Sequence, residues 1–280
     1  MNQALSAFLR QVRQLDVEPV VMKGQGVAQF YDNPLLRECG DIDLYFHSSA
    51  EETRVLDYLK RTGVPIRLEP DGSYEYVFQA VEMEHHTHLI DLYAPAIQTY
   101  LAHWEKQYGS VELSLGDDSE GTITVPSPLL NLLLLNTHIL KHSMGHGIGL
   151  RQFCDLARAY HQLNHAYNGE ELKTCLAQCG ISRWSRLLHS FLVNELHLPV
   201  EALPYEEELL DDTSCLLNKV MKAGNFGMYS GSRKGLTSSV WNRKWNTAFS
   251  FVRNLPFSLK YAPHEAVALV RRLCLGNLKS

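Results

Sequence analysis

The spacing of apolar residues in the first half of the chain predicts alternating helices and strands. Near the N-terminus they recur at helical intervals, at Leu5, Phe8, Leu9, Val12 and Leu15. Beyond this amphipathic helix we expect strands at residues 20–22, 41–46, 74–81, 88–93 and 122–125, and helices at 26–31 and 50–61. Ser48 or Ser49 can cap the second of these helices. This pattern is typical of a small mixed sheet covered by helices.

The pattern changes at Pro126-Ser127-Pro128 and is mostly helical afterwards. Ser127 can cap a helix, and Pro128 suits its first position. The predicted helices cover residues 129–144, 150–163, 170–178, 184–196, 206–223, 240–253 and 264–275. We therefore expect an α+β protein with a mixed-sheet domain at residues 1–126 and a mainly α-helical domain at residues 127–280.

Composition narrows the class of protein. The 280 residues are 45% hydrophobic and 20% charged, which is usual for a soluble globular protein. The apolar run Leu129–Leu135 is too short to span a bilayer, and the N-terminus lacks the pattern of a signal peptide. The six cysteines are scattered, without the paired spacing of a zinc site. These features predict a cytoplasmic protein with reduced thiols and no transmembrane segment.

Charge is distributed unevenly along the chain. The formal net charge is −5, yet residues 219–280 hold eleven Lys or Arg and one acidic residue, Glu265. Six aromatic residues interleave with these cations: Trp241, Trp245, Phe249, Phe251, Phe257 and Tyr261. Such a segment can bind RNA, rest on an anionic membrane, or dock on the acidic remainder of the chain. Because the overall charge is negative, nucleic acid is not the favoured partner.

The most informative chemistry lies in Asp41-Ile42-Asp43. Side chains two apart on a strand point to the same face, so the two carboxylates stand together while Ile42 turns to the core. Paired carboxylates suit Mg²⁺, which completes its coordination with water and substrate phosphates. The upstream turn Lys23-Gly24 allows backbone N–H groups to approach a phosphate, and Lys23 adds a compact positive charge.

These residues give the chain a family resemblance. Lys23-Gly24, Arg37, Gly40-Asp41-Ile42-Asp43-Leu44 and Ile90-Asp91-Leu92 together resemble the nucleotidyltransferase superfamily with the polymerase-β-like fold. The branch with a Lys-Gly turn, made up of uncharacterised bacterial nucleotidyltransferases, is the most similar. The resemblance implies Mg²⁺-dependent transfer of a nucleoside monophosphate from an NTP, with ATP as the expected donor, to an unidentified acceptor, with release of pyrophosphate.

The resemblance also assigns roles to residues. It implies that Asp41, Asp43 and Asp91 hold the metal and are catalytic, with Glu84 as the reserve for the third acid. Nucleotide-binding roles fall to Lys23, Gly24, Gln25 and Arg37. Apart from the resemblance, His142 beside Lys141 can also bind the nucleotide, by facing the triphosphate from the helical domain. For Lys23 and Arg37 the alternatives are a solvated strand end and a surface salt bridge, and Asp91 can simply end a strand.

Histidines offer a second kind of site. His138, His142 and His146 recur every fourth residue, so they line one helix face and can share a zinc ion. No carboxylate or thiol pattern completes such a site, so packed or solvated histidines are favoured. His85, His86 and His88 precede Asp91 without an assigned role.

Two other functions remain open at this level. A non-catalytic nucleotide-binding or partner-binding module can retain the same fold. A glycosyltransferase can use Asp41-Ile42-Asp43 for a nucleotide-sugar, although the pair comes before the usual nucleotide-binding unit is complete. The acceptor can be a small molecule, a protein side chain or an RNA end.

Overall fold

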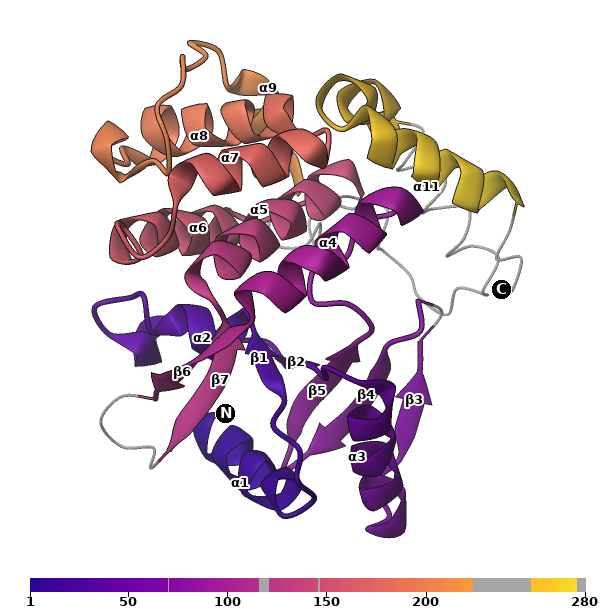
Figure 1. Cartoon of the computed structure of the whole chain (residues 1–280). Coiled ribbons are helices and arrows are strands. Elements are labelled where there is room, and N and C mark those ends of the chain that lie inside the picture. The colour runs from indigo at the N-terminus through magenta and orange to yellow at the C-terminus, as the bar shows by residue number, and fades with distance from the viewer. Residues whose placement is uncertain (70, 116–120, 146, 224–252, 276–280) are drawn as a thin grey trace. The chain divides into compact units, whose positions relative to one another are not determined.

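The computed structural model describes residues 1–69, 71–115, 121–145, 147–223 and 253–275, without the side chains of 273–275 (Figure 1). The described contacts divide the chain into two compact units. The first comprises residues 1–89 and 104–131, and the second comprises residues 90–103 and 132–280. The domain boundary expected at residues 126–127 stays a prediction, and each unit is described by itself.

The first unit contains a mixed sheet, which confirms the predicted α+β fold. Its strands are β1 Val20–Met22, β2 Ile42–Tyr45, β3 Ile66–Leu68, β4 Tyr74–Phe78, β5 Val81–His86, β6 Ser110–Ser114 and β7 Thr122–Pro126. Their order across the sheet is β3-β4-β5-β2-β1-β7-β6. The pairs β2·β5 and β1·β7 are parallel, and the other pairs are antiparallel.

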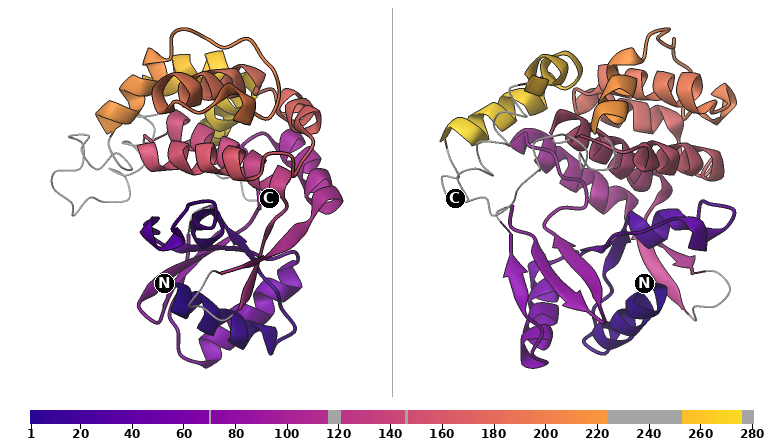
Figure 2. Two further views of the ribbon diagram at one scale, coloured as in Figure 1. Left: turned by 90° about the vertical axis from the view of Figure 1, so that its left-hand side faces the viewer. Right: turned by 180° about the vertical axis from the view of Figure 1, so that it is seen from behind.

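Two helices of the first unit, α1 Asn2–Arg13 and α3 Ser49–Arg61, cover one face of this sheet (Figures 1 and 2). Their apolar stripes form one core with the strands, and this core includes Phe8, Leu59, Ile42 and Leu44, all fully buried. Alternation along β2 then turns Asp43 to the opposite face of the sheet. The core face therefore determines where the candidate chemistry lies.

Two short helices of the first unit lie between β1 and β2. α2 Gly24–Ala28 begins directly after β1, and the 3₁₀ turn η1 Pro34–Leu36 precedes β2. Gly26 of α2 lies so close to β7 that a Cβ atom there would be 3.0 Å from Val125 Cγ1. A side chain at residue 26 would require Val125 or α2 to shift, so glycine favours this close packing.

The two predicted N-caps have different outcomes. Ser48 caps α3, since its hydroxyl accepts a hydrogen bond from the Glu51 N–H at 3.2 Å, as predicted. Ser127 precedes α5 Pro128–Met144, but its buried hydroxyl has no hydrogen-bond partner among the described residues. The side-chain cap predicted for Ser127 is therefore wrong, although the predicted start of the helix at Pro128 is right.

The second unit is helical in the residues described. Its elements are α6 Leu150–Gln162, α7 Gly169–Gln178, α8 Ser182–Leu196, η2 Val200–Ala202, α9 Ser214–Ala223, a helical segment at 253–261 and α11 Pro263–Leu275. α4 Pro95–Tyr108 and α5 contribute residues to both units. Trp184 is fully buried and donates its indole N–H to Asn136 Oδ1 at 2.9 Å. Within the described ranges, no helix has the length and apolar character needed to cross a membrane.

Of the aromatic residues in the basic C-terminal segment, Phe257 and Tyr261 lie within the described structure. Phe257 packs edge-on against Trp184 with ring centroids 6.2 Å apart, and Tyr261 lies 4.8 Å from Phe257. These two aromatic side chains therefore belong to the packing of the helical unit. The helix predicted at 240–253, with Trp241, Trp245, Arg243 and Lys244, lies outside the described residues except for Arg253.

Two predicted elements are wrong because side chains take over the backbone hydrogen bonds. The strand expected at 88–93 is an irregular segment, in which Gln98 of α4 donates to the Ile90 carbonyl at 2.8 Å and accepts from the Leu92 N–H at 3.0 Å. The helix expected from residue 206 begins at Ser214 instead. Before it, Leu210 is bonded through its N–H and its carbonyl to side chains of α8.

Candidate active site

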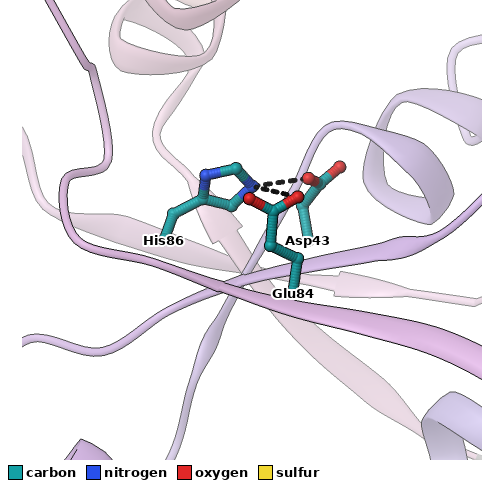
Figure 3. A group of neighbouring side chains, drawn as sticks. All are labelled: Asp43, Glu84 and His86. Carbon is teal, nitrogen blue, oxygen red and sulfur yellow. Dashed lines mark hydrogen bonds and ion pairs between the residues drawn. The ribbon is translucent and has the colours of Figure 1, made fainter. Parts of the chain in front are cut away.

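Asp43 is the centre of a polar cluster on the sheet face opposite the α1–α3 core (Figure 3). It lies on β2 directly opposite Glu84 of the parallel strand β5, and His86 follows two residues later on the same face. One ligand atom of each residue lies within 4.8 Å of the others. The sequence of β5 thus brings a second carboxylate and an imidazole to Asp43.

Two cationic or hydrogen-bonding partners converge on one oxygen of Asp43. Lys23 Nζ lies 3.0 Å from Asp43 Oδ1, and His86 Nε2 lies 2.6 Å from the same atom. His86 Nε2 is also 3.7 Å from Glu84 Oε2. Burial opposes ionisation of Asp43, which is only 6% exposed. The Lys23 ammonium and His86 outweigh this effect and hold the pKa of Asp43 well below its usual range.

Lys23 reaches Asp43 from an unusual backbone conformation. It follows β1 directly and has φ 45° and ψ −137°, a region that residues with a side chain seldom adopt. Gly24 continues the turn with φ 35°. Strain of this kind persists only where the surrounding structure enforces it, and it concentrates at functional sites. The conformation of Lys23 therefore marks the Lys-Gly turn as a functional candidate.

The other carboxylates of this face have raised pKa values. For Glu84 the main cause is burial, and the neighbouring Asp43 carboxylate adds to it. Asp41 lies just before β2, where partial desolvation and the Asp43 carboxylate raise its pKa. A cation bound beside such carboxylates would stabilise their ionised forms. Among the grouped ligand atoms, the carboxylates of Asp43 and Glu84 suit Mg²⁺, while His86 adds a nitrogen that Mg²⁺ favours less; the metal-binding role of Asp41 stays a prediction.

Gln25, in the first turn of α2, is a buried amide whose polar atoms have no partner in the part of the chain that the structure describes. It is 2% exposed, and neither its side-chain nitrogen nor its side-chain oxygen has a hydrogen-bond partner among the described residues. A buried amide that makes no hydrogen bond costs free energy. Gln25 thus has hydrogen-bonding capacity next to the strained Lys23.

The remaining predicted site residues have other contacts. Arg37 lies near its own turn, with Nη1 3.0 Å from Cys39 Sγ and 3.3 Å from the Glu38 carbonyl oxygen. Asp91, in the second unit, forms an ion pair with Lys141 of α5. The roles given to Arg37 and Asp91 stay predictions. Glu84, the reserve for the third acid, is the residue that the sheet places beside Asp43.

The histidines of the sequence fall into two groups. The rings of His138 and His142 lie on α5 with centroids 4.4 Å apart, and His146 is outside the described residues, so the nucleotide-binding role of His142 stays a prediction. His85 is fully buried on the core face, with Nε2 2.9 Å from the Tyr76 hydroxyl. His86 received no role from the sequence, and the signal that identifies it is its alternation with Glu84 along β5.

Comparison with known proteins agrees with this geometry. The sequence model of a family described as uncharacterised nucleotidyltransferase matches residues 1–193, a span that contains β1, β2, β5 and their polar side chains. The chain belongs to this nucleotidyltransferase family.

Membership of this family supports nucleotidyl transfer as the general function of the chain. Among solved structures, the chain is similar to the crystal structure of an antigenic nucleotidyltransferase-like protein from Paracoccidioides brasiliensis. The two share 16% sequence identity with a TM-score of 0.41, over 63% of this chain and 85% of the other. A search of curated proteins gave no match.

Proposed function

We propose that this family member transfers a nucleoside monophosphate from an NTP, with ATP as the expected donor, to an acceptor in the presence of Mg²⁺. The observation that carries the proposal is the convergence of Asp43, Glu84 and Lys23 on one face of the sheet. Carboxylates for a metal and a cation for a phosphate are the two elements that nucleotidyl transfer needs. Here both come from adjacent strands.

The proposed reaction forms one bond and breaks one. An acceptor oxygen attacks the α-phosphorus of the NTP, and the bond from that phosphorus to the oxygen bridging the β-phosphorus breaks, so that pyrophosphate leaves. The acceptor hydroxyl gives its proton to a carboxylate of the site, for which Glu84 and Asp91 are the candidates. Asp41, Asp43 and Glu84 would hold Mg²⁺, which supplies charge neutralisation at the phosphates.

Three groups of the turn that follows β1 would bind the nucleotide in this proposal. The Lys23 ammonium is the cation that the described site offers to a phosphate oxygen. The backbone N–H groups of the Lys23-Gly24 turn can approach the same phosphates. The amide of Gln25 can both donate and accept hydrogen bonds.

Pyrophosphate release tests this proposal. The purified protein would be incubated with each NTP and a cell extract, with Mg²⁺ or with a chelator, and pyrophosphate would be measured. We expect Mg²⁺-dependent release that Asp43→Asn reduces by at least about a hundredfold. Asp57→Asn is the matched control, because Asp57 is an exposed carboxylate of α3 on the core side of the sheet. Equal loss in both variants would count against a catalytic role of Asp43.

One observation favours a second function, a non-catalytic nucleotide-binding module. Lys23 and His86 already provide Asp43 with hydrogen-bonding and charged partners, so the carboxylate is satisfied without a metal. A module of this kind would bind an NTP at the Lys23-Gly24 turn and release no pyrophosphate. Equilibrium binding of a labelled NTP, measured beside pyrophosphate release, separates the two functions.

A further inference from the structure

A groove extends from the candidate active site across the neighbouring strands. Its volume is about 360 Å³, within the range of small-molecule sites. Asp41 and Glu84 line it at the end that belongs to the candidate site. The rest of its lining includes both charged and apolar side chains, chiefly Pro65, Arg67, Glu75, Val77 and Glu82.

Strand register explains why these side chains share a face. Arg67 pairs with Glu75, Glu75 pairs with Glu84, and Glu84 pairs with Asp43, so one row of charged residues crosses β3, β4, β5 and β2. Paired residues of neighbouring strands point to the same side of a sheet. The groove and the Asp43 cluster are therefore parts of one continuous polar surface.

The charges of the groove are only partly balanced. The Arg67 guanidinium pairs with Glu75 and Glu69. Glu82, opposite Val77 in the register, lies within the electrostatic influence of Arg67 but forms no hydrogen bond or direct ion pair within the described structure. Val77 presents an apolar surface beside it and is 56% exposed. Glu82 is thus a carboxylate without a direct ion-pair partner beside an apolar wall of the groove.

The groove and Lys23 lie on opposite sides of β2. In the strand order, β5, β4 and β3 extend from one edge of β2, whereas β1, which ends at Lys23, pairs with the other edge. Phosphoryl chemistry places the attacking oxygen and the leaving group roughly in line on opposite sides of phosphorus. With the triphosphate held at Lys23, the attacking acceptor would approach from the groove.

We propose that this groove is the acceptor site and that it takes a small hydroxylated molecule bearing a cationic amine. The assignment rests on the proposed function and adds the class of its acceptor. The hydroxyl would receive the nucleotidyl group near Asp41 and Glu84, while the amine pairs with Glu82. An RNA end is disfavoured, because four carboxylates and a single guanidinium line the groove and would repel phosphates.

Fractionated extract tests the acceptor class. A low-molecular-weight filtrate of a cell extract would be separated by ion exchange into cationic, neutral and anionic fractions, with total RNA as a fourth sample. Each would be incubated with the full-length protein, Mg²⁺ and NTPs labelled at the α-phosphate. We expect transfer of label to the cationic fraction. Label in any other fraction, or in none despite pyrophosphate release, would overturn the acceptor class. Absence of pyrophosphate release would instead contradict the proposed function, and the acceptor assignment would fail with it.

A matched pair of variants tests the groove itself. Glu82→Gln should raise the KM for the active fraction roughly three- to fivefold and leave the KM for the NTP unchanged, since an exposed charge pair contributes modestly. Glu112→Gln removes the same charge from β6, at the other edge of the sheet, and should change neither constant. Circular dichroism of both variants would establish that they fold. An unchanged acceptor KM in Glu82→Gln would rule out this carboxylate as the amine partner.

Discussion

Asp43 and Glu84 lie opposite each other across the parallel pair of strands β2 and β5. They are far apart in sequence, and only the sheet brings them together. Their environments differ, because Lys23 and His86 stabilise the charge of Asp43, whereas burial and Asp43 itself disfavour the charge of Glu84. The pair thus combines one carboxylate that ionises readily with one that resists ionisation.

Removal of Asp43 or Lys23 should reveal a coupled pair. Lys23→Met and Asp43→Asn should each destabilise the protein, because each leaves a largely buried partner without its counter-charge. The double variant should lose less stability than the two single variants lose together, with a coupling energy of about 1–3 kcal/mol. Urea unfolding of all four proteins at neutral pH measures it. Strict additivity would show that the 3.0 Å contact contributes nothing to stability.

Glu84→Gln should make the protein more stable at neutral pH while it abolishes transfer. The raised pKa of Glu84 means that its ionised form is disfavoured in the folded state, so replacement by a neutral isostere removes that penalty. We expect an increase in Tm of about 1–2 °C. The control is Glu112→Gln, whose Tm should not change. A lower Tm for Glu84→Gln would show that its carboxylate makes a net favourable contribution.

Acid should reduce the contribution of Asp43 to the stability of the protein. Its folded-state pKa is depressed, whereas an unfolded aspartate has a pKa of about 3.9. The stability that Asp43 provides is therefore complete above that unfolded value and is lost as the pH falls below it. The free energy of unfolding should decline less steeply between about pH 5 and pH 2 in Asp43→Asn than in the natural protein. Identical slopes would contradict the depressed pKa.

The strained turn predicts an unusual order of variant stabilities. Lys23→Gly removes the same charge as Lys23→Met, but glycine adopts φ 45° at little cost. We expect Lys23→Gly to be more stable than Lys23→Met by about 1 kcal/mol, while both variants lose affinity for the NTP. Thermal unfolding provides the comparison. Equal stabilities would indicate that residue 23 carries no backbone strain.

Packing of α2 against β7 gives a prediction on stability alone. Gly26→Ala would bring a methyl group to 3.0 Å from Val125 Cγ1 and should cost about 1–3 kcal/mol. Gly40→Ala is the matched control, because a Cβ there meets nothing within 4 Å. That variant should be neutral or slightly stabilising. Similar values for the two substitutions would mean that α2 can shift without cost.

The sequence predicted the elements of the site unevenly, for physical reasons. β1 is a short run of buried apolar residues and β2 alternates around Asp43, so both strands were predicted within a residue of their bounds. The alternation in β2 also predicted correctly that Asp43 points away from the core. β5 was missed because charged residues and histidines fill most of it, and the ring of its buried His85 lies in the core, where Nε2 contacts the Tyr76 hydroxyl. The residues that supply the chemistry thus remove the hydrophobic signal of their own strand.

A different limit explains the strand predicted at 88–93. Leu89, Ile90 and Leu92 are buried, so the apolar pattern correctly indicated burial. It could not indicate that Gln98 would satisfy the backbone of this segment in place of a neighbouring strand. Long-range side-chain contacts of this kind leave no periodic trace in the sequence.

The strand order also has a consequence for synthesis of the chain. All strands from β1 to β5 lie between residues 20 and 86, and this span contains Lys23, Asp43, Glu84 and His86. Among the described strands, the edge of β1 that faces away from β2 pairs with β7, at Val20 and Thr124, and β7 leaves the ribosome much later. During translation that edge stays available to other strands. Nascent chains halted before residue 122 should therefore aggregate more readily than chains that already include β7.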